Sequence, residues 1–274
     1  MDEYLNNPAV QAGILPFAGS LVVAALLCRT RFISLAVGAA FISVVALAIG
    51  FSLEPLNATR KLVLAGLVTI ACILLLDGLQ LRARAGLRVS LAAASGAAAV
   101  WMIAGVLAHQ PTQAAWLAAS AVAVFMALMV EFCIRPIEGD PVRGASAGLM
   151  LGLCAGGLAL LGASASAAQV GIALAAGSGG ALLVQMISNR KAPWGWTMAL
   201  PAGLIGSMAT VLAVFTGSLQ WWCVIPMLAI PWATRLVPVG KSPVWVTAIL
   251  TSLACAVPLS AAIALAWFTG GTAS

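Results

Sequence analysis

The chain has 274 residues, of which 63% are hydrophobic and only 7% are charged, and its mean hydropathy is +1.11. A soluble domain carries about 25% charged residues, so this composition excludes a water-soluble globular protein. The net charge of +6 comes from short basic clusters between apolar runs, a pattern typical of membrane topology signals, and we expect no nucleic-acid partner. The predicted fold class is an all-α, polytopic integral membrane helical bundle in a lipid bilayer.

Ten membrane-spanning helices are predicted from the apolar runs. A bilayer core of about 30 Å needs about 20 apolar residues per helix. Runs of about this length lie at 9–28, 33–52, 61–81, 89–108, 113–134, 144–162, 167–188, 197–216, 219–234 and 245–268. The segment MDEYLNNP before the first run is acidic and polar, unlike the basic start of a secretory signal peptide, so we expect the first run to remain as a mature helix.

The basic residues predict the orientation of these helices. With ten spans, alternate connections hold eleven of the thirteen Lys and Arg residues, and only Arg60 and Lys61 fall on the other side, in a connection that also carries Glu54. Connections rich in Lys and Arg stay in the cytoplasm. We therefore expect a multi-pass protein of the cell (inner) membrane with both termini outside.

The longest polar connection, RPIEGDPVR at 135–143, divides the chain into five predicted helices on each side. The prediction is a single transmembrane domain, 1–274, with possible halves 1–135 and 143–274 joined by a short cytoplasmic loop and with no soluble domain. Halves with an odd number of helices would insert in opposite directions, as in many transporters. The halves show no residue-by-residue similarity, so this division rests on helix number alone.

Two acidic residues lie near the inner ends of predicted helices, where a charge is costly and often functional. Glu131 precedes Arg135 by four residues, the favourable spacing for a helical ion pair, and Asp77 lies close to Arg82 and Arg84. One interpretation is that both acids pair with arginines that extend to the interface. The alternative is an inner vestibule for a cation or proton, lined by Asp77, Glu131, Arg135 and Gln185.

Glycines recur every four residues in RGASAGLMLGLCAGGLALLG at 143–162, and the next run carries small residues at the same interval. Residues four apart share one face of a helix, and small residues let membrane helices approach closely. We predict a glycine-zipper-like packing seam between the two helices, formed by Gly144, Gly148, Gly152, Gly156, Gly171, Ala175 and Gly179. A face for self-association and a substrate groove are the alternatives.

No pattern in the chain predicts catalysis, a cofactor or a metal site. The six cysteines form no CxxC pair, there is one histidine, His109, and HExxH, P-loop and dinucleotide motifs are missing. We therefore expect a protein that is not an enzyme and needs no cofactor. The first hypothesis is a carrier or exporter of a small, weakly charged or amphipathic molecule, and the alternative is a non-catalytic accessory or scaffold subunit of a larger membrane complex.

Overall fold

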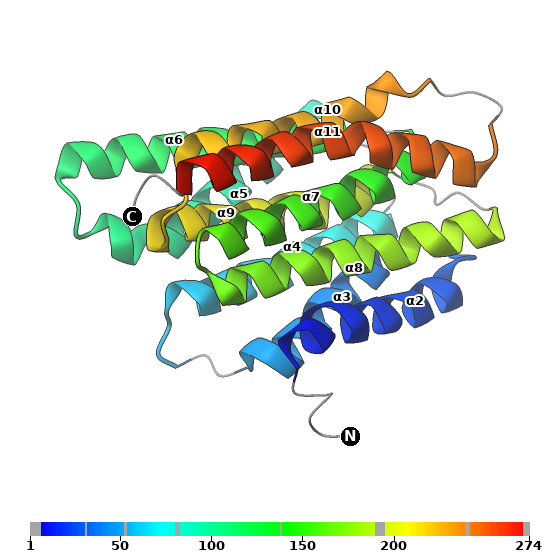
Figure 1. Ribbon diagram of the computed structural model, residues 1–274, viewed down its shortest axis with the longest axis horizontal. Coiled ribbons are helices and arrows are strands. Elements are labelled where there is room, and N and C mark those ends of the chain that lie inside the picture. Colours follow the sequence, from blue (N-terminus) through cyan, green and yellow to red (C-terminus); the bar gives the residue numbers. More distant parts are fainter. Residues whose placement is uncertain are drawn as a thin grey trace.

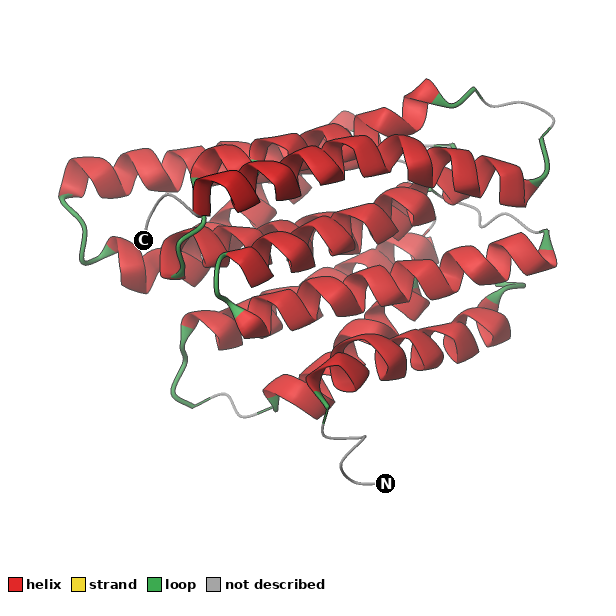
Figure 2. Ribbon diagram, in the orientation of Figure 1, coloured by secondary structure: helices red, strands yellow, loops and turns green. Residues whose placement is uncertain are grey.

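The computed structural model describes residues 7–30, 32–51, 54–79, 83–137, 139–189, 195–238 and 242–270, and these are helices and short connections (Figures 1 and 2). In chain order the helices are η1 (Val10–Ile14), α2 (Leu15–Leu27), α3 (Leu35–Val44), η2 (Val45–Ile49), α4 (Ala58–Leu79), α5 (Ala85–Leu107), α6 (Thr112–Ile134), α7 (Pro141–Leu161), α8 (Ala165–Ser188), α9 (Trp196–Thr216), η3 (Trp221–Cys223), η4 (Ile225–Leu228), α10 (Ala229–Ala233), η5 (Thr234–Leu236) and α11 (Val244–Gly270).

Eight helices of the described chain are long and apolar enough to cross a membrane. They are Val10–Leu27, which joins η1 to α2, then α4, α5, α6, α7, α8, α9 and α11. Their length and composition make the chain a multi-pass membrane protein within a lipid bilayer, as the composition predicts. The predicted count of ten spans is wrong, because two of the ten apolar runs do not form a long helix.

The first of these runs is 33–52. Its helix consists of ten residues in α3 and five in η2, about 22 Å in all, against a bilayer core of about 30 Å. The helix ends at Gly50, whose φ of 84° lies in the left-handed region that glycine adopts readily. The helix is therefore shorter than the apolar run that contains it.

The second run is 219–234. Pro226 and Pro231 lack the N–H that an α-helix needs, and the segment folds as η3, η4, α10 and η5, short 3₁₀ turns around one α-helical turn. Figure 1 shows it running beside α11, and contacts with α11 continue from η3 to η5. Hydropathy alone does not distinguish this segment from a regular helix.

Helix α9 forms the centre of the bundle. In its 18-residue membrane segment 89% of the residues are buried, compared with 67% in α7 and in α8 and 22% in α11. It packs against α7 and α8 on one side and against α4, α5 and α6 on the other. Since α9 belongs to the segment 143–274 and α4 to α6 belong to 1–135, the two proposed halves share one core.

At the end of the bundle where α6 ends and α5 and α7 begin lie Arg84, Arg88, Arg135, Arg143 and Arg235. We call this end the arginine-rich end. Contacts join its connections: an Arg235 N–H donates to the Arg135 carbonyl at 2.9 Å, and an Arg143 N–H donates to the Val237 carbonyl. Arg60 and Lys61 lie at the opposite end, where α4 begins. Five of the eleven basic residues that the sequence assigned to one side of the membrane, Arg31, Arg82, Arg190, Lys191 and Lys241, lie outside the described residues, so the predicted orientation stays a prediction.

Candidate functional site

Asp77 lies in the last turn of α4, and its side chain is buried between helices at the arginine-rich end. It accepts hydrogen bonds from the Ser34 hydroxyl, just before α3, and from the side chain of Thr197 in the first turn of α9. Its second oxygen, Oδ1, has no partner among the described residues. The expected neighbour Arg82 lies outside the described residues, so that pairing stays a prediction. The partners of this carboxyl group within the described residues are the hydroxyl groups of Ser34 and Thr197.

Glu131 lies in the last turns of α6 and binds two arginines. Arg135 is its partner on the same helix, and an N–H of Arg88 in the first turns of α5 donates to Glu131 Oε1 at 3.1 Å. The ion pair expected from the four-residue spacing is present. The second ion pair, with Arg88, was not predicted, and it joins α5 to α6 at the arginine-rich end.

Gln185 lies near the end of α8 and is 1% exposed. Neither its Nε2 nor its Oε1 has a hydrogen-bond partner within the described ranges. Among the described residues no hydrogen bond or ion pair connects Asp77, Glu131 and Gln185 with one another. The inner vestibule lined by these residues and Arg135 therefore stays a prediction.

The glycine stripe of α7 faces two different helices. A Cβ on Gly152 would lie 2.8 Å from the Cα of Ala175 and 2.9 Å from the carbonyl oxygen of Gly171, both in α8. A Cβ on Gly156 would lie 2.9 Å from Cγ1 of Ile172 in α8. Since real Cβ atoms do not approach other atoms this closely, side chains at these two glycines would force α7 and α8 apart.

The first two glycines of the stripe lie elsewhere. A Cβ on Gly144 would collide with the carbonyl of Gly195 before α9, and one on Gly148 would lie 2.7 Å from Ser178 Oγ in α8 and 3.0 Å from the Met198 carbonyl oxygen in α9. Gly179 is looser: a Cβ there would be 3.4 Å from Leu149. The stripe therefore lies where α7, α8 and α9 meet, and its neighbours come from this same chain.

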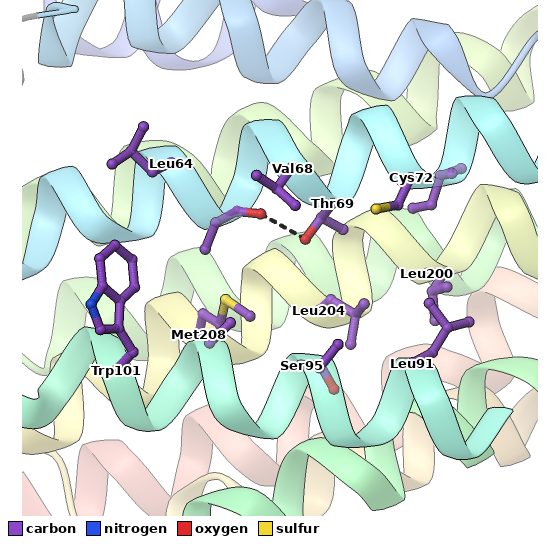
Figure 3. Close-up of a pocket in the computed structure, with 14 residues that line it drawn as sticks. Leu64, Val68, Thr69, Cys72, Leu91, Ser95, Trp101, Leu200, Leu204 and Met208 are labelled. Carbon is purple, nitrogen blue, oxygen red and sulfur yellow. Dashed lines mark hydrogen bonds between the residues drawn. The ribbon is translucent and has the colours of Figure 1, made fainter. Parts of the chain in front are cut away.

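A groove lies between α4 and α5, with α9 as its floor (Figure 3). Its volume is about 410 Å³, within the range of small-molecule sites. We call it the α4–α5 groove, and it is lined by Leu64, Ala65, Val68, Thr69, Cys72, Ile73, Leu91, Ala94, Ser95, Ala98, Trp101, Leu200, Leu204 and Met208.

The lining of this groove is almost entirely apolar. The hydroxyl groups of Thr69 and Ser95 donate to the carbonyls of Ala65 and Ala92 in their own helices, at 2.8 and 3.0 Å. Val68 is 61% and Trp101 43% exposed at the rim, so the groove opens sideways, where lipid surrounds the bundle. It is suited to an apolar chain that enters from the bilayer.

The groove exists because α4 and α5 are each held to other helices. At Gly96 a Cβ would lie 3.3 Å from the Cα of Ala123, so α5 lies close to α6, and the Arg88–Glu131 ion pair joins the same two helices. Asp77 holds α4 to α9 and to Ser34. At the end opposite to Asp77, Lys61 bridges the groove: its Nζ donates to the Trp101 carbonyl at 3.1 Å and lies 5.1 Å from the centre of the Trp101 ring.

The sequence did not identify the groove residues. Thr69 and Ser95 look like ordinary hydroxyl residues of a membrane helix, and the other lining residues are apolar. The available signal was the pair Arg60 and Lys61, the two basic residues on the side that is predicted to hold no other Lys or Arg. Comparisons of the chain with protein-family models, with curated proteins and with solved structures yield no match in any of the three.

Proposed function

We propose that the protein is a membrane carrier or exporter of a small amphipathic molecule, which enters the α4–α5 groove sideways from the bilayer. The observation that carries this proposal is the groove itself: about 410 Å³, apolar, open at the lipid-facing side and closed behind by α9. A water-soluble substrate would need polar groups converging on its site, and this lining offers almost none.

The same proposal includes an orientation. We place the arginine-rich end in the cytoplasm of a cell whose inner membrane holds the protein, because basic connections are retained there. The Lys61 end of the groove then faces the outer surface. Asp77 lies one turn beyond Ile73 on α4, so the groove points from the outer surface toward this buried carboxyl group.

A proline in the floor of the groove supports this proposal. Pro201 lies inside α9, next to the groove residue Leu200, and its nitrogen carries no hydrogen to donate to a helical hydrogen bond. Proline-containing helices in membranes bend at such positions. A bend in α9 would alter the depth of the groove without breaking the α7–α8 contact.

Reconstitution of the purified protein tests the proposal. Liposomes receive single-chain amphiphiles with neutral, anionic or cationic headgroups that cross protein-free bilayers slowly, and their transfer is followed by quenching from one side. We expect the protein to accelerate at least one of them. Ala98→Phe, which fills the groove, should abolish the acceleration, whereas Ala97→Phe, on the exposed face next to it, should not.

Two results would contradict the carrier. Equal transfer by Ala98→Phe and by the wild type would show that the groove is not the path. Failure to move any amphiphile, together with a stoichiometric partner in gently purified samples, would favour the accessory or scaffold subunit.

A further inference from the structure

We propose that the α4–α5 groove selects a single-chain amphiphile with an anionic headgroup, whose chain lies between α4 and α5 and whose headgroup binds Lys61. This inference rests on the proposed function of the groove and names its substrate class. It is carried by the position of Lys61, the length of the groove and the charge of the surrounding connection.

Lys61 lies where the groove reaches the outer interface. It precedes the lining residue Leu64 by one turn of α4, and its Nζ lies over the ring of Trp101, which lines the same end (Figure 3). An ammonium group has three N–H donors, and the contact with the Trp101 carbonyl uses one of them. The ammonium group is therefore held beside the mouth of the groove with donors left for a ligand.

The electrostatic environment at this end favours an anion. Arg60 and Lys61 are adjacent in the first turn of α4, and Glu54 in the preceding connection leaves one net positive charge. The positive partial charge of a helix N-terminus is added at the same place, because α4 begins at Ala58. These are the basic residues that depart from the one-sided distribution of the rest of the chain, and an anionic ligand supplies a reason for their position.

The length of the groove matches one acyl chain in one leaflet. From Leu64 to Ile73 the lining covers nine residue steps of α4, about 14 Å, which is about half of the 30 Å hydrocarbon core. Its volume of about 410 Å³ lies near the lower limit of small-molecule sites. We therefore commit to a single-chain ligand and not to a two-chain phospholipid.

Selection must come from the headgroup. Lipid tails are as apolar as the groove, so an acyl chain gains little free energy by leaving the bilayer for this site. A charged contact at the interface does distinguish one amphiphile from another, and a lysine near a membrane surface contributes about fivefold to the affinity for an anion. Lys61 is accordingly the specificity-determining residue of the groove.

The test is a binding titration in nanodiscs of zwitterionic lipid. The probes are a brominated alkyl sulfate and the brominated alcohol with the same chain, and the signal is quenching of tryptophan fluorescence that is lost in Trp101→Phe. We expect Lys61→Gln to weaken alkyl sulfate binding about fivefold and to leave alcohol binding unchanged. Arg60→Gln is the matched control for surface charge. The guanidinium group of Arg60 donates to the Pro55 carbonyl at 2.7 Å and has no contact with the groove, so we expect this change to weaken alkyl sulfate binding less than Lys61→Gln does.

Each other outcome overturns the inference in a distinguishable way. If Lys61→Gln and Arg60→Gln weakened alkyl sulfate binding equally, the anion would be attracted by the overall surface charge and not by a specific contact with Lys61. Equal affinity for sulfate and alcohol in the wild type would remove anion selection but leave the carrier standing, provided that Ala98→Phe blocks both probes. If a two-chain anionic phospholipid displaced the alkyl sulfate as strongly as a single-chain amphiphile does, the single-chain assignment would be wrong. If Ala98→Phe left the fluorescence quenching unchanged, the groove would not be the binding site.

Discussion

The two sides of α9 are packed in different ways. On one side α7 and α8 approach so closely that a Cβ at Gly152 would collide with the backbone of α8. On the other side α4 and α5 stand apart, and the space between them is the α4–α5 groove. Both pairs are adjacent in the chain and joined by short connections, so connectivity does not explain the difference.

Both the side chains at the facing positions and the contacts of each helix with other helices contribute to the difference. The α7–α8 contact is made through Gly152, Gly156 and Gly171, where helices in lipid gain van der Waals contact by close approach. The facing positions of α4 and α5 include Leu64, Leu91 and Trp101. Ala94 and Ala98 also line the groove, so small residues close a helix pair only where the two helices are held together, whereas α5 is held to α6 and α4 to α9. The predictions below test this contrast in order of expected effect.

The largest effect is expected for Gly152→Leu. The new side chain has no space between α7 and α8, and overpacking of this kind costs about 3 kcal/mol or more when backbone must move. Thermal unfolding in detergent should show a much lower midpoint than the wild type. Gly105→Leu on α5 is the control, because nothing lies within 4 Å of a Cβ there. A Gly152→Leu variant that melts like the wild type but changes its oligomeric state would show that the stripe faces another copy.

The next effect is expected for Asp77→Ala. The change leaves the hydroxyl groups of Ser34 and Thr197 without their acceptor, at a cost of about 1–3 kcal/mol for buried groups. Removing the partners as well, in the combination Ser34→Ala, Asp77→Ala and Thr197→Val, should restore part of the loss. The measurement is the thermal unfolding midpoint of the single and triple variants. A triple variant less stable than Asp77→Ala would disprove the view that the hydrogen bonds from Ser34 and Thr197 to Asp77 hold α4 in place.

A smaller effect is expected for the ion pairs of Glu131. Arg88→Gln should cost about 1 kcal/mol or less, because the pair is partly exposed, with the Arg88 side chain 23% accessible. Arg135→Gln should cost less, since that side chain is 58% accessible and its pair stays within one helix. Both losses should shrink at high salt. A larger loss of stability for Arg135→Gln than for Arg88→Gln would contradict the view that the Arg88–Glu131 ion pair holds α5 against α6.

The smallest effect is expected for Ala94→Leu in the groove. This change adds a side chain like that of Gly152→Leu, but Ala94 is exposed and lines an open space. Surface changes of this kind alter stability by less than about 0.5 kcal/mol. An unfolding midpoint far below that of the wild type would show that the groove is closed in the folded protein and would remove the contrast between the two sides.

Prediction from sequence succeeded for features that depend on composition or on the spacing of residues along one helix. Low charge and high hydropathy predict a membrane bundle, and the spacing of Gly152 and Gly156 places both on one face of a helix, the face that lies against α8 in the structure. The count of spans failed at 33–52 and 219–234, because hydropathy does not register the left-handed Gly50 or the prolines 226 and 231. For Asp77 the sequence suggested nearby arginines, and it could not reveal the hydroxyl groups of Ser34 and Thr197, which are distant in the chain.

By itself the sequence determined that this protein is a multi-pass membrane bundle of helices, and it predicted a packing seam of small residues within 143–179 and an orientation from the basic connections. Only the tertiary structure decided that α9 is the centre, that α5 is held to α6 while α4 is held to α9, and that a groove therefore remains between α4 and α5. The physical reason is that burial in lipid depends on the composition of each segment, whereas a cavity depends on which helices become neighbours and on how closely their side chains let them approach.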